Sequence, residues 1–214
     1  MEKMETKEEI CKSEFTGSAV EYFGVNFAVV FLSIITLGIA YPFMHAMRLK
    51  WVRTRTFIQG RKLTFDGKGA QLLGKYLLWL LLTLVTLGIY GILCLPLNMN
   101  RWEASHTHFE DAQGEPSEFD GHIWQYFGVR FLAGFVSLIT LGIGSFWAHC
   151  YLLRWEYKHT VYSGARLAFD GLGMEYFGKR FVWGLLSLIT LGIYGIWVGG
   201  KELAWTVSHT QIAV

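Results

Sequence analysis

The sequence alternates polar segments with four long stretches that contain no Asp, Glu, Lys or Arg. These stretches hold 26 residues between Glu21 and Arg48, 25 between Lys75 and Arg101, 23 between Arg130 and Arg154, and 20 between Arg180 and Lys201. The hydrocarbon core of a bilayer excludes ionised side chains, and a helix of about 20 residues crosses its thickness of about 30 Å. The pattern therefore predicts four membrane segments, at about 22–47, 76–100, 131–153 and 181–200.

The same pattern is part of an internal repeat of about 50 residues. Each copy opens with Phe-x-Gly, continues to a Thr-Leu-Gly-Ile string, and ends with a tryptophan and a threonine. The opening phenylalanines are Phe15, Phe65, Phe119 and Phe169, at spacings of 50, 54 and 50. Alternate copies share more identical residues than neighbouring copies do, so the chain also consists of two similar halves of two repeats each. We expect a polar tail at 1–14, a first half at 15–110 and a second half at 111–214.

These observations predict an all-α polytopic membrane protein made of four tandem repeats. Each repeat would have one membrane segment, broken near its Thr-Leu-Gly-Ile motif, and one interfacial helix. An alternative is four helical hairpins, that is, eight short helices, with all connections on one face. In the first repeat the arms would be about 22–35 and 41–54, joined by a turn at 36–39. Arms of about 14 residues reach only about 21 Å.

Composition and charge support lipid contact. Hydrophobic residues make up 52% of the chain and charged residues 17%, and the net charge of +2 does not indicate a nucleic-acid partner. The polar start of the chain predicts no signal peptide, and the odd set of Cys11, Cys94 and Cys150 does not indicate a disulfide framework. Lys and Arg number three, eight, two, five and one in the successive polar segments. With four spans, this alternation places the first and third connections in the cytoplasm.

The connections have local signals of their own. Alternating apolar and polar residues around Gly60 and Gly164 predict short β-hairpins. Asp66, Asp120 and Asp170 each precede a glycine, and we expect them to cap the helices that follow. In the acidic middle connection, His106 and His108 are weak candidates for metal ligands, because no third ligand stands at a recognised spacing.

Small and hydroxyl residues recur around the Thr-Leu-Gly-Ile motif, where they favour helix packing or, alternatively, a strip that lines a solute path. They are Ser33, Thr36, Gly38, Thr83, Thr86, Gly88, Ser137, Thr140, Gly142, Ser187, Thr190 and Gly192. Basic and aromatic residues follow each motif as candidates for contact with lipid headgroups. They are Arg48, Lys50, Trp51, Arg53, Arg55, Arg154 and Trp155. His45 and His149 occupy matching positions, either at interfacial depth or in a proton relay.

The strings Tyr-Phe-Gly, Leu-Ile-Thr-Leu-Gly-Ile-Tyr and Gly-x-(Arg or Lys)-Leu-x-Phe-Asp-Gly resemble the YjgN-like family of bacterial inner-membrane proteins. The resemblance covers nearly the whole chain after Phe15. It implies a multi-pass protein of the bacterial inner membrane and supplies no substrate or catalytic residue.

The sequence shows no catalytic triad, phosphate loop or paired-cysteine motif, so we expect neither an enzyme nor a cofactor. The favoured function is a self-associating, membrane-shaping scaffold that forms a homo-oligomer in the lipid bilayer. Two alternatives remain: a small-solute channel or transporter built from the duplicated halves, and a membrane subunit that binds a partner protein.

Overall fold

The structure is a computed structural model that describes residues 12–112 and 114–213. The expected polar tail at 1–14 therefore lies mostly outside the described residues, as does Cys11. Each repeat folds as a strand, a helical hairpin and a second strand.

The elements of the first repeat are β1 (Glu14–Phe15), α2 (Ala19–Ile35), α3 (Tyr41–Arg53) and β2 (Thr56–Ile58). Those of the second are β3 (Arg61–Phe65), α4 (Gly69–Val85), α5 (Ile89–Leu93), α6 (Leu95–Ser105) and β4 (Thr107–Phe109). Those of the third are β5 (Glu118–Phe119), α7 (Ile123–Ile139), α8 (Ser145–Lys158) and β6 (Thr160–Tyr162). Those of the fourth are β7 (Ala165–Phe169), α9 (Gly173–Ile189), α10 (Gly195–Ser208) and β8 (Thr210–Ile212).

The strands form two antiparallel sheets, one from each half of the duplication. Their orders are β1-β2-β3-β4 and β5-β6-β7-β8. The expected β-hairpins are present, as β2–β3 around Gly60 and β6–β7 around Gly164. The first connection pairs with the middle one through β3 and β4, and the middle one pairs with the third through β5 and β6. All three connections therefore lie together, and the topology that placed them on alternate sides of a membrane is wrong.

The Phe-x-Gly motif brings the first strand of each repeat onto the second helix. The Phe119 ring meets the Trp155 ring edge-on, with centroids 5.9 Å apart, and a Cβ added at Gly121 would lie 2.4 Å from the Phe119 ring. The other three repeats contain the same edge-on pair, at centroid distances of 5.8 Å, 5.6 Å and 5.7 Å. The repeated glycine is thus required because any side chain there would push the two rings apart.

The Thr-Leu-Gly-Ile motif ends one helix and reverses the chain. In the second repeat the Thr86 hydroxyl donates to the Leu82 carbonyl and accepts from the Tyr90 N–H, and the Gly88 N–H donates to the Thr83 carbonyl. Leu87 and Gly88 both have positive φ, of 49° and 91°. This geometry is a Schellman stop, and it occurs at the same place in all four repeats.

The chain reversal overturns the predicted membrane segments. Each charge-free stretch is folded back on itself, and the longest helices of the described residues have 17 residues. None of the described helices is long and apolar enough to cross a membrane. The all-α polytopic fold and the multi-pass placement in a bacterial inner membrane are therefore wrong. The helix pairs correspond instead to the alternative of helical hairpins, here combined with two sheets.

The second helix of each hairpin is not a separate interfacial helix, contrary to expectation. Helix α3 packs against α2 on one side and α4 on the other, while α8 packs against α7 and α9. Helix α10 also packs against α2, so the fourth hairpin touches the first. A lipid surface and a neighbouring helix select the same apolar side chains, so the sequence pattern does not distinguish an interfacial helix from a packed one.

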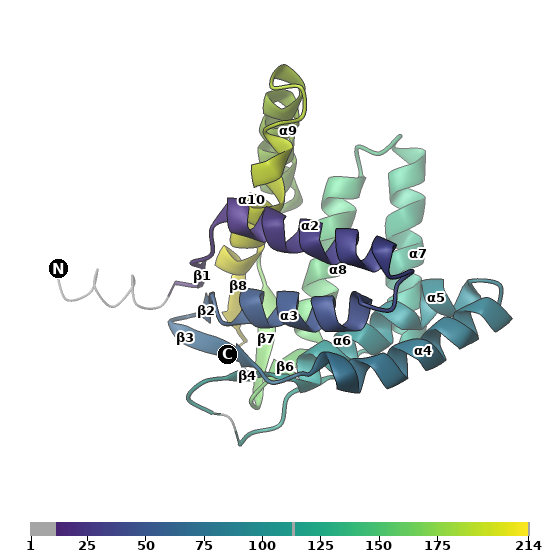
Figure 1. Cartoon of the computed structure of the whole chain (residues 1–214). Coiled ribbons are helices and arrows are strands. Elements are labelled where there is room, and N and C mark those ends of the chain that lie inside the picture. Colours follow the sequence, from purple (N-terminus) through teal and green to yellow (C-terminus); the bar gives the residue numbers. More distant parts are fainter. Residues whose placement is uncertain (1–11, 113, 214) are drawn as a thin grey trace, which may run out of the picture.

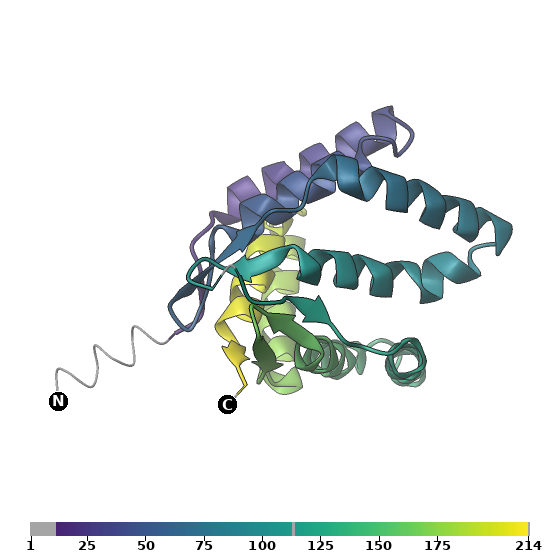
Figure 2. The ribbon, with the colours of Figure 1, turned by 90° about the horizontal axis from the view of Figure 1, so that it is seen from below.

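The strands gather at one end of the molecule and the hairpins project away from them (Figure 1). Hairpins α7–α8 and α9–α10 point to the top of Figure 1, whereas α2–α3 and α4–α6 point to the right. In the view from below, α4 starts beside α3, and the tips of the first two hairpins lie apart (Figure 2). The start of α3, next to the first tip, packs on α4, where the Tyr41 and Tyr76 ring centroids are 5.4 Å apart. The start of α8 packs on α9 in the same way, through Trp147 and Phe177. The four tips themselves lie apart (Figure 1).

A hydrophobic core joins the two halves at the bases of the hairpins. Both sheets contribute to it, with Leu63 and Phe109 from the first half and Tyr162 and Leu167 from the second. The Phe109 N–H donates to the Ser163 hydroxyl at 3.0 Å, across the boundary between the halves. The core shared by the two halves thus lies at the end that carries the strands.

Candidate functional site

The hairpin tips carry the largest exposed apolar surfaces of the described chain. Four equivalent leucines at the tips are 92–94% exposed, and twelve flanking Leu, Ile and Val residues are each at least 60% exposed. The leucines are Leu37, Leu87, Leu141 and Leu191, and the flanking residues lie at 34, 35, 39, 84, 85, 89, 138, 139, 143, 188, 189 and 193. Apolar patches of this kind mark sites that bind lipid or another protein.

Charged residues begin at nearly the same distance from every tip. Counting along the sequence, the nearest charged residue stands 10 to 12 positions from the tip leucine: Arg48, Lys75, Arg130 and Lys201. At 1.5 Å per helical residue this is about 15–18 Å. Of the eight residues that bound the charge-free stretches, all except Glu21 are basic. Five of the seven basic residues are exposed: Lys75, Arg101, Arg130, Arg154 and Lys201.

The hydroxyl residues near the tips mostly bond to their own helices. Thr83 donates to Trp79, Ser137 to Ala133 and Thr190 to Leu186, each to a backbone carbonyl at 2.7 Å. Within the described chain, Ser33 keeps a buried hydroxyl without a partner. These residues and the glycines that follow them build the turn, and the solute path along their hydroxyls stays a prediction from the sequence.

The candidates for headgroup contact are mostly engaged inside the protein. Trp51 and Trp155 pack on the Phe-x-Gly phenylalanines, and the Arg55 guanidinium lies 4.5 Å from the Trp51 ring. Arg154 donates to the Gly171 carbonyl at 3.2 Å while remaining exposed. Lys50 is also exposed. The two tryptophan rings therefore pack inside the fold, and headgroup contact by Lys50 and Arg154 stays a prediction from the sequence.

His45 is a buried member of a polar cluster that also contains Arg48 and Arg53. Its Nε2 donates to Glu103 Oε1 at 3.0 Å, and Arg48 Nη2 lies 3.5 Å from its Nδ1. Arg53 Nη2 lies 3.6 Å from Glu103 Oε2. Burial raises the pKa of the Glu103 carboxyl, but the hydrogen bond and charge of His45, with Arg53 and Arg48, outweigh it and hold the pKa below its ordinary value.

Glu103 was missed in the sequence, although a signal for it exists. It stands directly after the repeat tryptophan, where the first repeat has Val52, the third has Glu156 and the fourth has Thr206. A charge at a position that is uncharged in two of the four copies indicates a buried ion pair. Glu103, Arg53 and Glu156 line a cavity of about 160 Å³ between the halves.

His149, the counterpart of His45, lies in a different cluster centred on Glu202. Its Nε2 is 3.7 Å from Glu202 Oε1, and Arg180 donates to Glu202 Oε2 at 3.2 Å. Burial lowers the pKa of His149, and burial raises the pKa of the neighbouring Cys150 thiol to about 11. The two histidines therefore bind separate carboxylates and do not form one relay.

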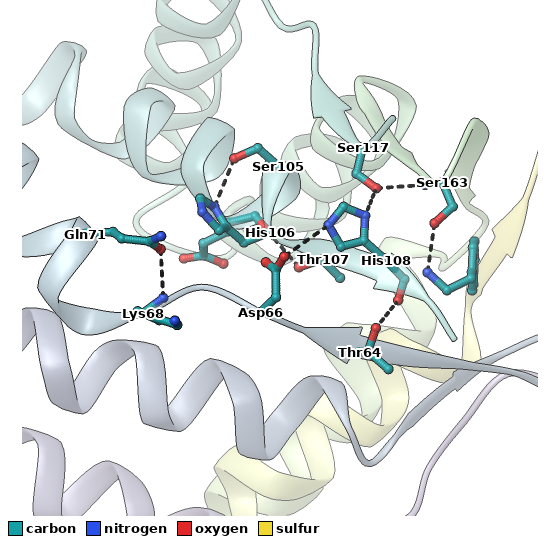
Figure 3. Close-up of polar contacts among 12 residues, drawn as sticks. Thr64, Asp66, Lys68, Gln71, Ser105, His106, Thr107, His108, Ser117 and Ser163 are labelled. Atoms are coloured by element: carbon teal, nitrogen blue, oxygen red, sulfur yellow. Dashed lines mark hydrogen bonds and ion pairs between the residues drawn. The ribbon is translucent and has the colours of Figure 1, made fainter. Parts of the chain in front are cut away.

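His106 and His108 also have separate partners (Figure 3). His106 Nδ1 is 2.8 Å from the Trp102 carbonyl, whereas His108 Nδ1 is 2.9 Å from the Ser117 hydroxyl. His108 Nε2 lies 3.9 Å from Asp66 Oδ2. Among residues 12–112 and 114–213, no group of three or more His, Cys, Asp or Glu is arranged to hold a metal ion.

The aspartates do not cap the helices, which corrects that expectation. The N-cap positions of α4, α7 and α9 are Lys68, His122 and Leu172, two residues after the respective aspartates. The Asp66, Asp120 and Asp170 backbone N–H groups instead donate to the His106, His159 and His209 carbonyls at 3.0–3.1 Å. Asp120 also pairs with Arg166 at 2.7 Å. Each aspartate therefore holds the chain where it leaves a strand. The helix begins only after the glycine that follows the aspartate.

Comparison of the chain with protein-family models, curated proteins and solved structures finds no match.

Proposed function

We propose that this chain binds one leaflet of a lipid bilayer, with its four hairpin tips inserted as wedges, and acts as a membrane-shaping scaffold. One observation carries the proposal: at every tip a leucine with positive φ is 92–94% exposed. The proposal involves no membrane-spanning helix and assigns no reaction to the chain.

The tip leucines are costly in water. A left-handed backbone disfavours any residue with a Cβ by about 1–2 kcal/mol, and exposing a leucine side chain forgoes about 2 kcal/mol of burial. Gly88 and its equivalents already supply one left-handed residue per tip, yet the residue before each is a leucine. Insertion into hydrocarbon offsets the exposure, because the side chain points away from its own protein.

The length of the uncharged part of each hairpin fits one leaflet. Half of a hydrocarbon core is about 15 Å thick, and the first charged residues stand about 15–18 Å from the tip leucines along the helix, which is the greatest depth that a hairpin can reach before a charge enters. With the tips in hydrocarbon, the exposed Lys75, Arg130 and Lys201 reach the phosphate level. Basic residues at this level favour anionic lipids.

The separation of the four tips supports a role in shaping the membrane. Because the tips lie apart, they displace lipid at four places in one leaflet and none in the other (Figure 1). Such an asymmetric insertion expands one leaflet and favours curvature. Self-association and membership of the YjgN-like family stay predictions from the sequence, and the proposal depends on neither.

A flotation assay tests the proposal with the full chain and vesicles of phosphatidylcholine and phosphatidylglycerol at 7:3. Leu141→Asp and Leu191→Asp should each lower the affinity at least about tenfold, since burying one leucine corresponds to about 2 kcal/mol. Leu172→Asp is the matched control, because Leu172 is also an exposed leucine but lies at the base of α9. Equal affinities for all three variants would contradict the proposal.

A second measurement separates insertion from association between copies. Nitroxide labels on Leu191→Cys and Lys62→Cys, in a variant with the native cysteines replaced by alanine, report accessibility to oxygen and to a water-soluble nickel complex. We expect residue 191 to be shielded from nickel only with vesicles present and residue 62 to stay accessible from the side of addition. Shielding of residue 191 without lipid, together with dimerisation, would identify a second copy as the occupant and overturn the proposal.

A further inference from the structure

Glu175 binds three donors at the base of the fourth hairpin. Its Oε1 accepts from the Trp205 indole N–H at 2.9 Å and lies 3.3 Å from Lys179 Nζ, and its Oε2 lies 3.1 Å from His209 Nε2. An indole, an ammonium and an imidazole therefore converge on one carboxylate, which joins the first turn of α9 to the end of α10.

The second repeat contains the same three donors without the carboxylate. Lys75, Trp102 and His106 occupy the positions of Lys179, Trp205 and His209, but Gln71 replaces Glu175. The Gln71 side chain is turned away and accepts from the Lys68 backbone N–H at 3.1 Å (Figure 3). Of these four positions, only the one that holds the acceptor differs between the second and fourth repeats: an amide replaces the carboxylate.

The Trp102 indole is left without a partner. Trp102 is 2% exposed, and its Nε1 is a buried donor with no hydrogen bond in the described chain. The His106 ring keeps the orientation of His209, because its Nδ1 is 2.8 Å from the Trp102 carbonyl and that of His209 is 2.9 Å from the Trp205 carbonyl. A buried donor of this kind carries a desolvation cost unless an acceptor reaches it.

Space and charge for such an acceptor are present. Trp102, Lys75 and Arg101 line a cavity of about 440 Å³ that is completed by Trp79, Asn98 and Ser105. None of these described lining residues carries a carboxylate. Arg101 adds a second cation, where the fourth repeat has Ala204.

We propose that the base of the second hairpin binds the phosphate of a phospholipid headgroup in the place that the Glu175 carboxylate takes in the fourth hairpin. The Trp102 N–H and Lys75 are donors at the cavity, and the His106 ring, which is not among the lining residues, has the orientation of His209. Arg101, which also donates to the Gly121 carbonyl at 3.1 Å, contributes charge. Lys75 stands 12 positions before Leu87, or about 18 Å from the tip, and Trp102 stands 15 positions after it, or about 22 Å. The cavity of an inserted hairpin therefore lies at the headgroup level and at its outer edge. The depth argument rests on the proposed function, whereas the donor set does not.

Indole N–H resonances of the ¹⁵N-labelled full chain, in a non-ionic detergent, test the site. The Trp102 signal is assigned by Trp102→Phe. Soluble dihexanoyl phosphatidylglycerol should shift this signal downfield at a concentration at least tenfold below that required for inorganic phosphate. No shift with either probe would overturn the site, and an equal or stronger response to inorganic phosphate would overturn the assignment to lipid.

Two charge exchanges provide matched controls. Gln71→Glu should shift the Trp102 signal without added ligand and abolish its response, because the new carboxylate takes the donors as Glu175 does. Glu175→Gln should make the Trp205 signal respond to the short-chain lipid. A full response of Trp102 in Gln71→Glu would contradict the proposal.

A tip variant separates this inference from the proposed function. Leu87→Asp leaves all donors in place, so its Trp102 signal should respond as in the unmodified chain even if vesicle binding is weakened. Loss of the response in Leu87→Asp, in a chain that stays folded, would show that the cavity does not bind the headgroup by itself.

Discussion

Glu103 and Glu156 stand at equivalent positions of the second and third repeats, and both line the cavity between the halves. Their carboxyl groups differ in ionisation. His45 and Arg53 hold the pKa of Glu103 below its ordinary value despite burial, whereas burial raises the pKa of Glu156 and Arg130, 3.8 Å away, offsets this only in part. Folding therefore stabilises the ionised form of Glu103 and destabilises the ionised form of Glu156.

This difference predicts opposite effects of neutralising the two residues. Because the pKa of Glu103 is lowered on folding, its contribution to stability is present above about pH 4.5 and is lost as the pH falls through the folded pKa. Glu103→Gln should lower the melting temperature at pH 7 and approach the unmodified chain in acid. The pKa of Glu156 is raised, so its cost appears as the pH rises above about 4.5, and Glu156→Gln should raise the melting temperature at pH 7.

Thermal unfolding followed by circular dichroism between pH 3 and 8 measures both effects. The two variants control for each other, since each replaces one glutamate at the same repeat position. A loss of stability at pH 7 in both variants would contradict the assignment.

The tip hydroxyls supply a second prediction. Thr86→Val removes both the hydrogen bond to the Leu82 carbonyl and the acceptor for the Tyr90 N–H without changing the size of the side chain. We expect a loss of about 1–2 kcal/mol in the free energy of unfolding and faster hydrogen exchange at the Tyr90 amide. Thr86→Ser keeps the hydroxyl and should retain most of the stability. Equal losses in the two variants would show that the methyl group, rather than the hydrogen bonds, holds the turn.

The repeat, the reversal at its centre and the β-hairpins are readable from the sequence because they depend on local residues. Gly60 and Gly164 predict tight turns, and Thr-Leu-Gly-Ile contains the glycine of a helix C-terminus. The prediction of four spans is wrong because each charge-free stretch contains this stop signal in its middle. Two short helices joined by a turn have the same mean hydropathy as one long spanning helix of the same sequence.

The clusters around Glu103, Glu175 and Glu202 follow from contacts that no local pattern contains. Glu103 meets His45 from another repeat, and Glu202 meets Arg180 from another helix. Comparing the copies position by position recovers part of this information, since a residue such as Gln71 stands out only against its counterpart Glu175. The pairing of the sheets likewise joins segments that a spanning topology would separate.

The repeated glycines predict opposite responses to alanine. A Cβ at Gly121 would lie 2.4 Å from the Phe119 ring and 2.7 Å from the Trp155 ring, so Gly121→Ala should cost about 1–3 kcal/mol. Gly128 lies inside α7 with nothing within 4 Å of an added Cβ, so Gly128→Ala should stabilise the helix by about 0.5–1 kcal/mol. Chemical unfolding of both variants checks this, and a stabilised Gly121→Ala would contradict the packing argument.

The exposed basic residues that stand 10 to 14 positions from the tip leucines make the interaction with lipid dependent on salt. Each Lys or Arg near an anionic surface contributes about 1 kcal/mol, and the Debye length falls from about 10 Å at 0.1 M salt to about 3 Å at 1 M. Raising the salt from 0.05 M to 0.5 M should therefore weaken binding to vesicles with 30% phosphatidylglycerol at least about tenfold. Binding to pure phosphatidylcholine should be weaker at low salt and nearly independent of salt, since there only the apolar tips contribute.

Single lysines locate this effect on the hairpins. Lys201 stands ten positions from Leu191, at the expected headgroup level, whereas the exposed Lys158 stands 17 positions from Leu141, near the strands. Lys201→Gln should lower the affinity for anionic vesicles about fivefold, the equivalent of about 1 kcal/mol, and Lys158→Gln should leave it nearly unchanged. Because both exchanges lower the net charge equally, a general attraction to the whole chain predicts equal losses. Equal losses would therefore place the lipid somewhere other than around the tips.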